Sequence, residues 1–396
     1  MKLLNFIGAT VFGSATLIGY GIYDGNEKVY SNLLIPIIHK TMDGERAHNL
    51  AIFMAKYGLV PRERKFENEQ ILNIRVFDKK FKNPIGCAAG FDKNAEAIDG
   101  LFKIGFGFVE IGTVTPLSQE GNPKPRVFRL SEDRAVINRY GFNGQGHDEV
   151  LKRVDQFWKN RKIDEKILGV NIGKNKLQQD ALSDYLTGLK LFANKCDYIT
   201  INISSPNTPG LRSLQNRKEL ENLIDPVEFY HLLLEMRNKL DKKIPLVIKI
   251  APDLTDEEMK DIAQVALRKN KQIDGLIVSN TTISRPDFLK SELKKESGGL
   301  SGRPLKTIST EALKKMFKLT EGKIILIGVG GVESGNDALE KIKSGASLIQ
   351  LYTSMVFEGP IIVNKIKKEL IELLNKEGYS NVSEAIGANV YHKNSK

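Results

Sequence analysis

The sequence is poor in the residues that build disulfide frameworks, metal centres and most hydrolase active sites. It contains only two cysteines, Cys87 and Cys196, which have no metal-binding spacing and are too few for a disulfide framework. We interpret both as small buried hydrophobic residues. The five histidines are scattered, none lies near Ser205, which is discussed below, and no G-x-S-x-G motif occurs. These absences argue against a metal site and against a Ser-His-Asp hydrolase.

The sequence also lacks a long Lys/Arg block and any recognisable nucleic-acid-binding module, so nucleic acid is a disfavoured partner. Its net charge is nevertheless +11, from 59 basic and 48 acidic residues spread along 396 positions. This excess favours anionic partners, such as a phosphate-bearing cofactor, an acidic substrate or an anionic membrane surface. A hydrophobic content of 41% is ordinary for a globular protein with a full core.

Only one uncharged stretch, residues 3–23, is long enough to cross a bilayer once as a helix. Lys2 precedes it, as in a secretory signal peptide, but no clear small-residue cleavage site follows. We predict that residues 1–27 form an uncleaved targeting and transmembrane anchor, with a cleaved signal as the alternative. The rest of the chain is then a soluble body tethered at its N-terminus.

Residues 28–70 predict an amphipathic helical hairpin. Pro36 must kink or start the first helix, and the second begins near Asp43 and ends near Gly58. The apolar stripes of these helices either pack on the following domain or lie half-sunk in a bilayer surface, and both interpretations stay open. Residues 61–70 are charged and predict a linker.

From residue 71 to residue 396 strand patterns alternate with helical ones, which predicts an α/β fold with a (β/α)8 TIM barrel. A capping box, Thr255 with Glu258, opens one of the helices. Longer segments follow the second, fourth and sixth strands, at the end where barrel active sites are built. The expected strands are 84–89, 106–112, 167–172, 197–203, 245–250, 275–279, 323–328 and 347–351.

Small, amide, hydroxyl or lysine residues follow every expected strand. In the fourth strand, isoleucines 199, 201 and 203 share one face, and Thr200 and Asn202 share the other, as in a barrel strand whose inner face meets a ligand. Ser205 follows on a loop stiffened by Pro206 and Pro209. Alone, this loop could be an ordinary Ser/Pro/Asn turn. Eight such strand ends together favour a functional rim.

The seventh strand indicates a phosphate site. Gly328-Val329-Gly330-Gly331 precedes a helix, and such a turn offers free backbone N–H groups and a positive dipole end. Glu333 stands where a dinucleotide-binding fingerprint has its third glycine, so a mononucleotide fits better. By strand parity Lys249 points into the barrel, where a lysine needs an anionic partner. A flavin ring that gains negative charge on reduction would supply one.

In this arrangement the chain resembles the membrane-bound, quinone-reducing class of the dihydroorotate dehydrogenase family from about residue 30 to residue 388. The motifs that carry the resemblance are AAGFDK (88–93), EGNPKPRVFRL (120–130), INRYGFN (137–143), GVNIGKNK (169–176), NISSPNTPGLRSLQ (202–215), KIAPDLT (249–255), SNTTISRP (279–286), GGLSGRPL (298–305) and IGVGGVESGNDALEKI (327–342).

The resemblance implies an enzyme of pyrimidine biosynthesis that oxidises dihydroorotate to orotate, with FMN in the barrel and ubiquinone as the electron acceptor. It places the protein at the mitochondrial inner membrane, with a bacterial inner membrane as the alternative. Ser205 matches the position of the catalytic base, where soluble members carry cysteine. Serine is a poor base without histidine, so a relay through Thr208 and water is expected, with Phe142 shielding the site and Lys249 beside the flavin.

The resemblance also assigns three further groups of residues. The expected FMN shell is Ala88, Ala89, Gly90, Lys93, Thr113, Asn171, Asn202, Lys249, Ser279, Ser301, Gly302, Gly330, Gly331, Tyr352 and Thr353. The expected substrate shell is Lys93, Asn138, Arg139, Tyr140, Gly141, Phe142, Asn143, Asn202, Asn207, Asn280 and Thr281. The expected quinone tunnel is Ile35, His39, Ala47, His48, Ala51, Leu59, Arg129, Tyr352 and Pro360, where His39 departs from the glutamine of vertebrate-like members.

Two alternatives compete with this interpretation. Another FMN barrel, such as a dihydropyrimidine or dihydrouridine reductase, should bring iron–sulfur cysteines or a nucleic-acid-binding module, and neither is present in the sequence. A membrane-tethered scaffold that has lost catalysis would not need Ser205, Lys249 and Lys93.

Overall fold

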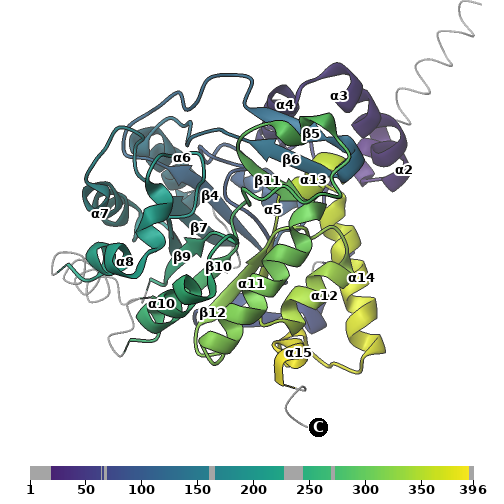
Figure 1. Cartoon of the computed structure of the whole chain (residues 1–396). Helices are drawn as coiled ribbons and strands as arrows, with labels where there is room; N and C mark the ends of the chain where they lie inside the picture. The colour runs from purple at the N-terminus through teal and green to yellow at the C-terminus, as the bar shows by residue number, and fades with distance from the viewer. Residues whose placement is uncertain are drawn as a thin grey trace, which may run out of the picture.

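The structure, a computed structural model, describes residues 19–63, 65–66, 69–159, 166–226, 244–268 and 273–391. Eight parallel strands close into a barrel in the order β10–β12–β13–β3–β4–β7–β8–β9, with helices around it (Figure 1). The predicted (β/α)8 barrel is therefore confirmed, and each expected strand lies within two residues of an observed one. The barrel strands are β3 (Ile85–Cys87), β4 (Phe108–Val114), β7 (Ile167–Ile172), β8 (Tyr198–Asn202), β9 (Leu246–Ile250), β10 (Gly275–Val278), β12 (Ile325–Val329) and β13 (Leu348–Leu351).

Amphipathic helices cover the outside of the barrel because each buries one apolar stripe against the strands. The expected capping box is present at α10, where Thr255 and Glu258 bond to each other's backbone N–H groups. Within the described residues, the helices that follow the first barrel strand are α5 (Ile98–Ile104), α6 (His147–Lys159), α7 (Ala181–Phe192), α8 (Arg217–Ile224), α10 (Asp256–Ala266), α11 (Lys306–Leu319), α12 (Gly335–Lys343), α13 (Thr353–Glu358), α14 (Ile362–Lys376) and α15 (Ala388–Tyr391).

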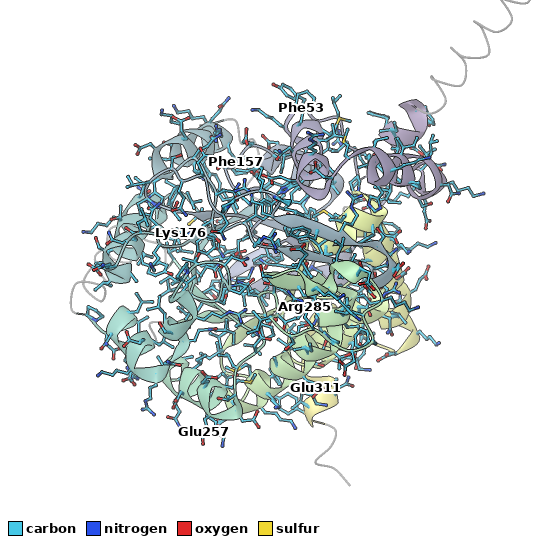
Figure 2. The ribbon with its side chains drawn as sticks, turned by 45° about the horizontal axis from the view of Figure 1, so that its top comes forward. Phe53, Phe157, Lys176, Glu257, Arg285 and Glu311 are labelled. Atoms are coloured by element: carbon cyan, nitrogen blue, oxygen red, sulfur yellow. The ribbon has the colours of Figure 1, made fainter. Side chains whose placement is uncertain are left out.

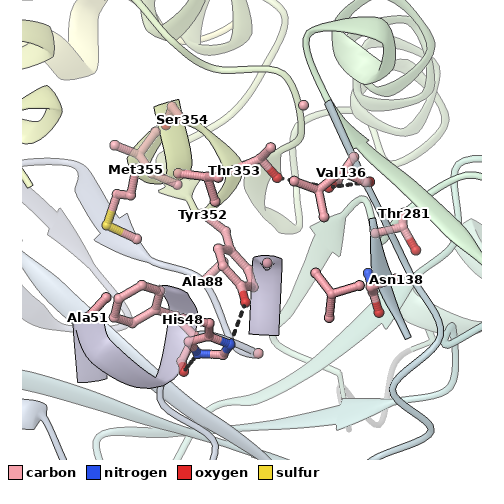
Figure 3. Close-up of a pocket in the computed structure, with 18 of the residues that line it drawn as sticks. His48, Ala51, Ala88, Val136, Asn138, Thr281, Tyr352, Thr353, Ser354 and Met355 are labelled. Carbon is pink, nitrogen blue, oxygen red and sulfur yellow. Dashed lines mark hydrogen bonds between the residues drawn. The ribbon is translucent and has the colours of Figure 1, made fainter. Parts of the chain in front are cut away.

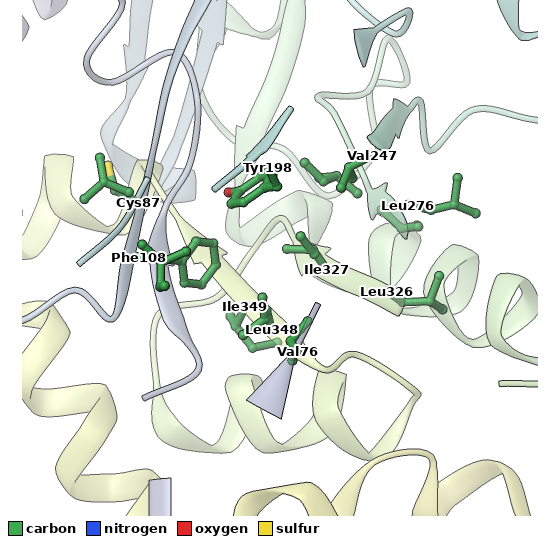
Figure 4. Packing of buried hydrophobic residues seen from close by; sticks show 14 of the residues in the cluster. Val76, Cys87, Phe108, Tyr198, Val247, Leu276, Leu326, Ile327, Leu348 and Ile349 are labelled. Atoms are coloured by element: carbon green, nitrogen blue, oxygen red, sulfur yellow. The ribbon is translucent and has the colours of Figure 1, made fainter. Parts of the chain in front are cut away.

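Two large aromatic side chains, Phe108 and Tyr198, pack in the barrel interior (Figure 4), and each lies beside a glycine on a neighbouring strand. Phe108 of β4 pairs with Gly86 of β3, and Tyr198 of β8 pairs with Gly169 of β7. A Cβ atom on Gly86 would lie 2.3 Å from the Phe108 ring, and one on Gly169 would lie 2.2 Å from the Tyr198 ring. Glycine is required at both positions because the aromatic ring already occupies that volume.

A β-hairpin, β1 (Ile74–Val76) with β2 (Lys79–Phe81), packs against the same aromatic cluster. Phe77 and Asp78 form its turn with positive φ angles, the geometry of a type I′ turn. The Phe77 ring packs 6.2 Å from the Tyr198 ring, and Phe81 packs edge-on against Phe108 at 5.5 Å. This hairpin was not predicted. Its turn contains Phe77 where a tight turn usually has glycine or asparagine, and packing against Tyr198 stabilises the positive φ of Phe77.

A second small sheet forms from the longer segments that follow the second and sixth barrel strands. It comprises β5 (Val127–Leu130), β6 (Ala135–Asn138) and β11 (Gly299–Gly302), all antiparallel, with β6 in the centre. Figure 1 places this sheet beside helices α3 and α4, at the end of the molecule away from α15. This small sheet was not predicted from the pattern of strands and helices.

In the segment predicted as a helical hairpin, residues 28–70, the helical elements are α2 (Glu27–Val29), the π-helical turn η1 (Tyr30–Leu34), α3 (Ile35–Thr41) and α4 (Gly44–Lys56); the name helical hairpin is used below for α3 and α4. Pro36 starts α3 directly after the π turn, where the Ile35 N–H donates to the Tyr30 carbonyl. Asp43 caps α4 by accepting the Arg46 N–H at 2.9 Å. Within the described residues, no helix is long and apolar enough to cross a membrane. Most of the predicted anchor, residues 1–18, lies outside the described residues.

The segment predicted as a linker, residues 61–70, is attached to the helices around the barrel at its start. Glu63 accepts a hydrogen bond from Lys367 of α14 at 2.7 Å, and both side chains are almost fully buried. The Glu63 N–H also donates to the Lys103 carbonyl at 2.9 Å. Breaking a buried ion pair by removing one partner costs about 3–5 kcal/mol, so this contact fixes the base of the hairpin.

His147, at the start of α6, is a buried histidine whose ring nitrogens have no hydrogen-bond partner in the described part of the chain. Burial lowers its pKa to about 4, against a weaker opposing effect of Asp148. The unfolded chain binds a proton at this residue below about pH 6.5, and the folded chain does so only below about pH 4. The stability that neutral His147 contributes is therefore present above pH 6.5 and is lost as the pH falls through this window.

We therefore expect His147→Leu to gain stability relative to the parent protein as the pH is lowered. Between pH 7 and pH 5 the difference in unfolding free energy should move in favour of the variant by about 2 kcal/mol. Urea unfolding at both pH values measures this change. A difference that is the same at both pH values would show that His147 has the same pKa in the folded and the unfolded chain, and would contradict the lowered pKa.

Candidate active site

A cavity of about 490 Å³ opens at the carboxyl ends of the barrel strands and extends under the small sheet to the helical hairpin. Its lining combines the barrel rim, strands β5, β6 and β11, and helices α3 and α4. Figure 3 shows part of this lining, with His48 and Ala51 on one side and Asn138 and Thr281 on the other. One continuous space therefore joins the polar rim to a mainly apolar channel within the hairpin.

The floor of the polar end is a chain of hydrogen bonds that crosses neighbouring strands. Asn202 Nδ2 donates to Thr113 Oγ1 at 2.9 Å, and Thr113 Oγ1 donates to Asn171 Oδ1 at 2.6 Å. Asn171 Nδ2 then donates to Glu110 Oε1 at 2.8 Å. Because a carboxylate only accepts, each amide in the chain has a fixed orientation. The other oxygen of Glu110 accepts from Tyr198 and Gln350 at 2.9 and 2.8 Å.

Lys249 of β9 lines the cavity beside this floor and is 5% exposed. Its backbone lies opposite Asn202 in the β8–β9 register, so the inward direction predicted from strand parity is confirmed. Burial lowers the pKa of Lys249, and the charge of Glu110 opposes that shift. No hydrogen-bond acceptor contacts Nζ within the described residues, so an anionic ligand would be its natural partner.

Ser205 is 6% exposed and lies in the lining of the cavity on the serine loop, residues 204–213. Its Oγ accepts the N–H of Asn207 at 3.3 Å. Asn207 in turn donates its side-chain amide to the Asn138 carbonyl of β6 at 3.1 Å, which ties the loop to the small sheet. Thr208 is buried next to it, and its Oγ1 has no partner in the described residues. Such an orphaned hydroxyl is where a bound water would be expected.

Lys93 is a second lysine at the cavity and is half-buried. Its Nζ donates to Asn143 Oδ1 at 2.7 Å and lies 3.1 Å from the centre of the Tyr140 ring. Burial and the nearby Arg126 hold the pKa of Lys93 well below its usual value, against a weaker effect of Glu45. Its hydrogen-bond partner is a neutral amide, so a carboxylate ligand would complete this cation as well.

At the hairpin end, His48 connects α4 to the barrel. Its Nε2 lies 2.7 Å from the Phe91 carbonyl and must donate to it, so Nδ1 is the acceptor for Tyr140 OH at 3.1 Å and Tyr352 OH at 3.3 Å (Figure 3). Burial, together with the charge of Lys93, lowers the pKa of His48 to about 4, so the ring is neutral at neutral pH.

Arg129 donates to the Met42 carbonyl at 2.8 Å, while its buried Nε has no partner in the described residues.

The Gly330–Gly331 turn lines the cavity where β12 ends, and both glycines have positive φ angles. A Cβ atom on Gly331 would lie 2.5 Å from the backbone nitrogen of Lys306, which no side chain could tolerate. Close by, Thr353 Oγ1 donates to Ser301 Oγ at 2.8 Å. Backbone N–H groups and hydroxyls in a glycine turn form a cradle suited to a phosphate group.

Most of the residues expected from the resemblance line this cavity, including all nine of the expected tunnel. Four do not: Asn171 accepts a hydrogen bond from Thr113, Thr208 is buried within the serine loop, Asn143 accepts a hydrogen bond from Lys93, and Arg139 forms an ion pair with Glu296 at 2.6 Å. None of these four residues lies on the surface of the cavity that a ligand would touch.

Two features of the site were not predicted from the sequence, namely Glu110 and a cluster of ion pairs beside the Gly330–Gly331 turn. Glu110 could have been noticed as a lone carboxylate in the hydrophobic run FVEIGTV. In the cluster, Glu333 binds Arg134 at 2.8 Å and also Arg303, and Arg134 binds Glu358. No local signal indicates these pairs because their partners are far apart in sequence.

Comparison with known proteins agrees with this architecture. The family model described as dihydroorotate dehydrogenase matches residues 71–374. "Dihydroorotate dehydrogenase (quinone), mitochondrial" from Mus musculus is 48% identical over 96% of this chain and 95% of its own length. "Dihydroorotate dehydrogenase (quinone)" from Rhodospirillum rubrum is 47% identical over 88% and 91%. A crystal structure titled DHODH in complex with ferulenol, from Eimeria tenella, superimposes with a TM-score of 0.84 at 44% identity, covering 90% of this chain and 98% of that one. This chain belongs to the dihydroorotate dehydrogenase family.

Proposed function

We propose that this protein is a flavin-dependent oxidoreductase that oxidises (S)-dihydroorotate to orotate in pyrimidine biosynthesis, with ubiquinone as the electron acceptor. The single observation that carries the proposal is the continuous cavity, which has two lysines, Lys93 and Lys249, and an amide-lined rim at one end and an apolar channel at the other. A polar anionic substrate and an apolar acceptor would reach the same cofactor from these two ends.

The cofactor that fits the residues is FMN. Gly330, Gly331, Ser301 and Thr353 would hold its phosphate, and Lys249 would face the part of the ring that becomes anionic. When bound, FMN supplies a hydride acceptor for the substrate and a two-electron donor for the quinone. The glycine turn that admits no Cβ atom and the Lys249 Nζ that has no hydrogen-bond acceptor within the described residues both support this fit.

Ser205 is the residue that takes the C5 proton of dihydroorotate while the C6 hydride leaves, which forms the C5–C6 double bond of orotate. The N–H of Asn207 stabilises the serine oxygen, and the unpartnered hydroxyl of Thr208 offers a place for a water that carries the proton away. Lys93 binds the carboxylate of the substrate, and the amides of Asn138, Asn207 and Asn280 bind its ring. Phe142 lines the same pocket and keeps water away from it.

The channel is the route for the quinone. His39, Ala47, Ala51 and Leu59 line it with mainly apolar surface, and the free Nε of Arg129 offers a donor for a quinone carbonyl. We place the anchor in residues 1–27, the hairpin in 28–70 and the catalytic barrel in 71–396, with the protein at the mitochondrial inner membrane. The name of the mouse relative contains the word mitochondrial and supports the mitochondrial part of this placement.

A two-step spectroscopic experiment tests this function. Purified protein should be yellow, anaerobic dihydroorotate should bleach the flavin absorbance, and a short-chain ubiquinone should restore it. A colourless protein that stays inert after FMN is added would overturn the proposal. Bleaching by NADPH but not by dihydroorotate would favour another FMN barrel.

The phosphate cradle gives a further prediction. Gly331→Ala should lower the FMN content of the purified protein to a small fraction, because the new Cβ collides with the Lys306 backbone. Gly378→Ala is the matched control, since Gly378 has a similar positive φ of 79° but nothing within 4 Å of its Cβ position. Both variants carry the strain of about 1 kcal/mol for a residue at positive φ. FMN content measured after denaturation separates collision from strain, and equal FMN in both variants would exclude the glycine turn as the phosphate site.

A further inference from the structure

Arg212 does not line the cavity, yet its guanidinium joins three of the loops that form the rim. It lies in the short helix η4 (Leu211–Gln215), at the end of the serine loop. Its Nε donates to the Ser204 carbonyl at 3.0 Å, and its Nη2 donates to the Thr281 carbonyl at 2.8 Å. The third contact is an ion pair between Nη1 and Asp253 Oδ2 at 2.8 Å. One planar side chain therefore bonds to the segments that follow β8, β9 and β10.

Asp253 extends the same connection. Besides Arg212, it accepts hydrogen bonds from Thr282 Oγ1 and from the Ile283 N–H at 3.2 Å, both on the loop after β10. Its side chain is 14% exposed and that of Arg212 is 21% exposed, so solvent screens the pair only in part. An Arg–carboxylate pair that also satisfies several backbone groups holds its partners in one geometry, because the guanidinium is rigid.

The atoms held by this pair are direct neighbours of the reacting groups. The carbonyl of Ser204 precedes Ser205, and the carbonyl of Thr281 follows Asn280. The two segments also meet directly, since Asn280 Nδ2 donates to Ser204 Oγ at 2.9 Å. A shift of either loop would thus change the position of the Ser205 hydroxyl relative to a substrate held by Asn280.

We propose that Arg212 and Asp253 form a clamp that positions Ser205 against the C5 atom of the substrate. Both are positioning residues, because neither lines the cavity. The inference rests on the proposed function and adds a role in the proton-abstraction half of the reaction. A misplacement of about 1 Å caused by a change away from the chemistry costs up to about 10²-fold in rate.

Arg212→Lys is the main test variant, because it keeps the positive charge but loses the planar fork that reaches three acceptors. With dihydroorotate, its flavin should bleach about 10- to 100-fold more slowly than in the parent protein. Asp253→Asn keeps the size of the side chain, removes its charge and should act in the same direction. Arg217→Lys is the matched control, because Arg217 makes exposed ion pairs with Glu221 and Asp261 at 3.0 and 3.5 Å and no contact with the rim loops.

Isotope effects separate positioning from a general loss of structure. In Arg212→Lys, deuterium at C5 of the substrate should slow flavin bleaching by a larger factor than in the parent protein, because proton abstraction becomes more rate-limiting. The isotope effect of deuterium at C6 on the bleaching rate should be no larger in Arg212→Lys than in the parent protein. FMN content should stay at the parent level. A variant with parental isotope effects but lowered melting temperature and FMN content would overturn the clamp, and so would bleaching at the parental rate.

The experiment distinguishes failure of the proposed function from failure of the Arg212–Asp253 clamp. If the proposed function is wrong, dihydroorotate leaves the spectrum of the parent protein unchanged. If only the clamp is wrong, dihydroorotate bleaches the flavin of the parent protein, and it bleaches the flavin of Arg212→Lys and of Asp253→Asn at the same rate as in the parent. Should Arg212→Lys fail to fold, Asp253→Asn with the two deuterated substrates decides the outcome.

Discussion

Ser205→Ala is expected to keep its flavin and to let dihydroorotate reduce it about 10²- to 10⁴-fold more slowly than the parent protein does, the range that a positioned general base contributes. The serine hydroxyl lines the cavity, and its oxygen accepts an N–H from Asn207. Within the described residues no histidine is hydrogen-bonded to Ser205, and the neutral ring of His48 is bonded to Phe91 and two tyrosines. Anaerobic stopped-flow bleaching of the flavin measures the rate.

Two companion variants make that result specific. Ser213→Ala removes an exposed hydroxyl of the same serine loop, which donates only to the Gly210 carbonyl at 2.6 Å, and its rate should equal that of the parent protein. Ser205→Cys restores an acidic group at the same place, so its rate should exceed that of Ser205→Ala and rise with pH as the thiolate forms. Full-rate bleaching in Ser205→Ala would remove serine from the mechanism.

The barrel and its rim could be predicted because each depends on local pattern. The alternation in β8 placed Thr200 and Asn202 inward, and strand parity placed Lys249 beside them, as the structure confirms. Strand ends of parallel strands meet at one rim, so residues that follow each strand could be grouped without knowing the contacts. The long family motifs then added the substrate and tunnel residues.

What could not be predicted depends on pairs that are distant in sequence. Strand β11 pairs with β6 across more than 160 positions, as in Leu300 with Ile137, and neither strand has a strong pattern of its own. The Glu63–Lys367 pair is similar, because the charge of Glu63 suggested an exposed linker and only the fold shows that α14 supplies its partner. Arg212 and Asp253 were visible within motifs, but their shared contact with Ser204 and Thr281 requires the structure.

Whether the helical hairpin forms the route of the quinone is a question that deleting it would answer poorly. Removing residues 1–70 would also remove Glu63 from its buried pair with Lys367, at a cost of about 3–5 kcal/mol. It would further uncover Gly100, which packs so closely on α4 that a Cβ atom there would lie 2.1 Å from the Ala55 carbonyl oxygen. Loss of activity in such a truncation could reflect instability, so a point change within the channel is the sharper test.

Ala51→Trp is that change. Ala51 lines the hairpin end of the cavity, on the same side as His48 (Figure 3), so an indole there occupies the space through which a quinone would pass. Overfilling a packed site costs about 1–3 kcal/mol. Because about 1.4 kcal/mol is tenfold in affinity, reoxidation of the reduced flavin by ubiquinone should become about 10- to 100-fold less efficient. Reduction by dihydroorotate should be unchanged, since the polar end of the cavity is untouched.

Phe53→Trp is the matched control, because Phe53 is on the same helix, is 52% exposed and lies on the outer surface of the molecule (Figure 2). It enlarges an aromatic side chain without entering the cavity, so both half-reactions should keep their parental rates. Double-mixing stopped flow, with dihydroorotate first and ubiquinone second, reports the two steps separately. Parental reoxidation in Ala51→Trp would mean that the quinone reaches the flavin by another path. Slowing of both steps to the same degree would mean that the indole has displaced the barrel rim, since a blocked channel affects only the acceptor side.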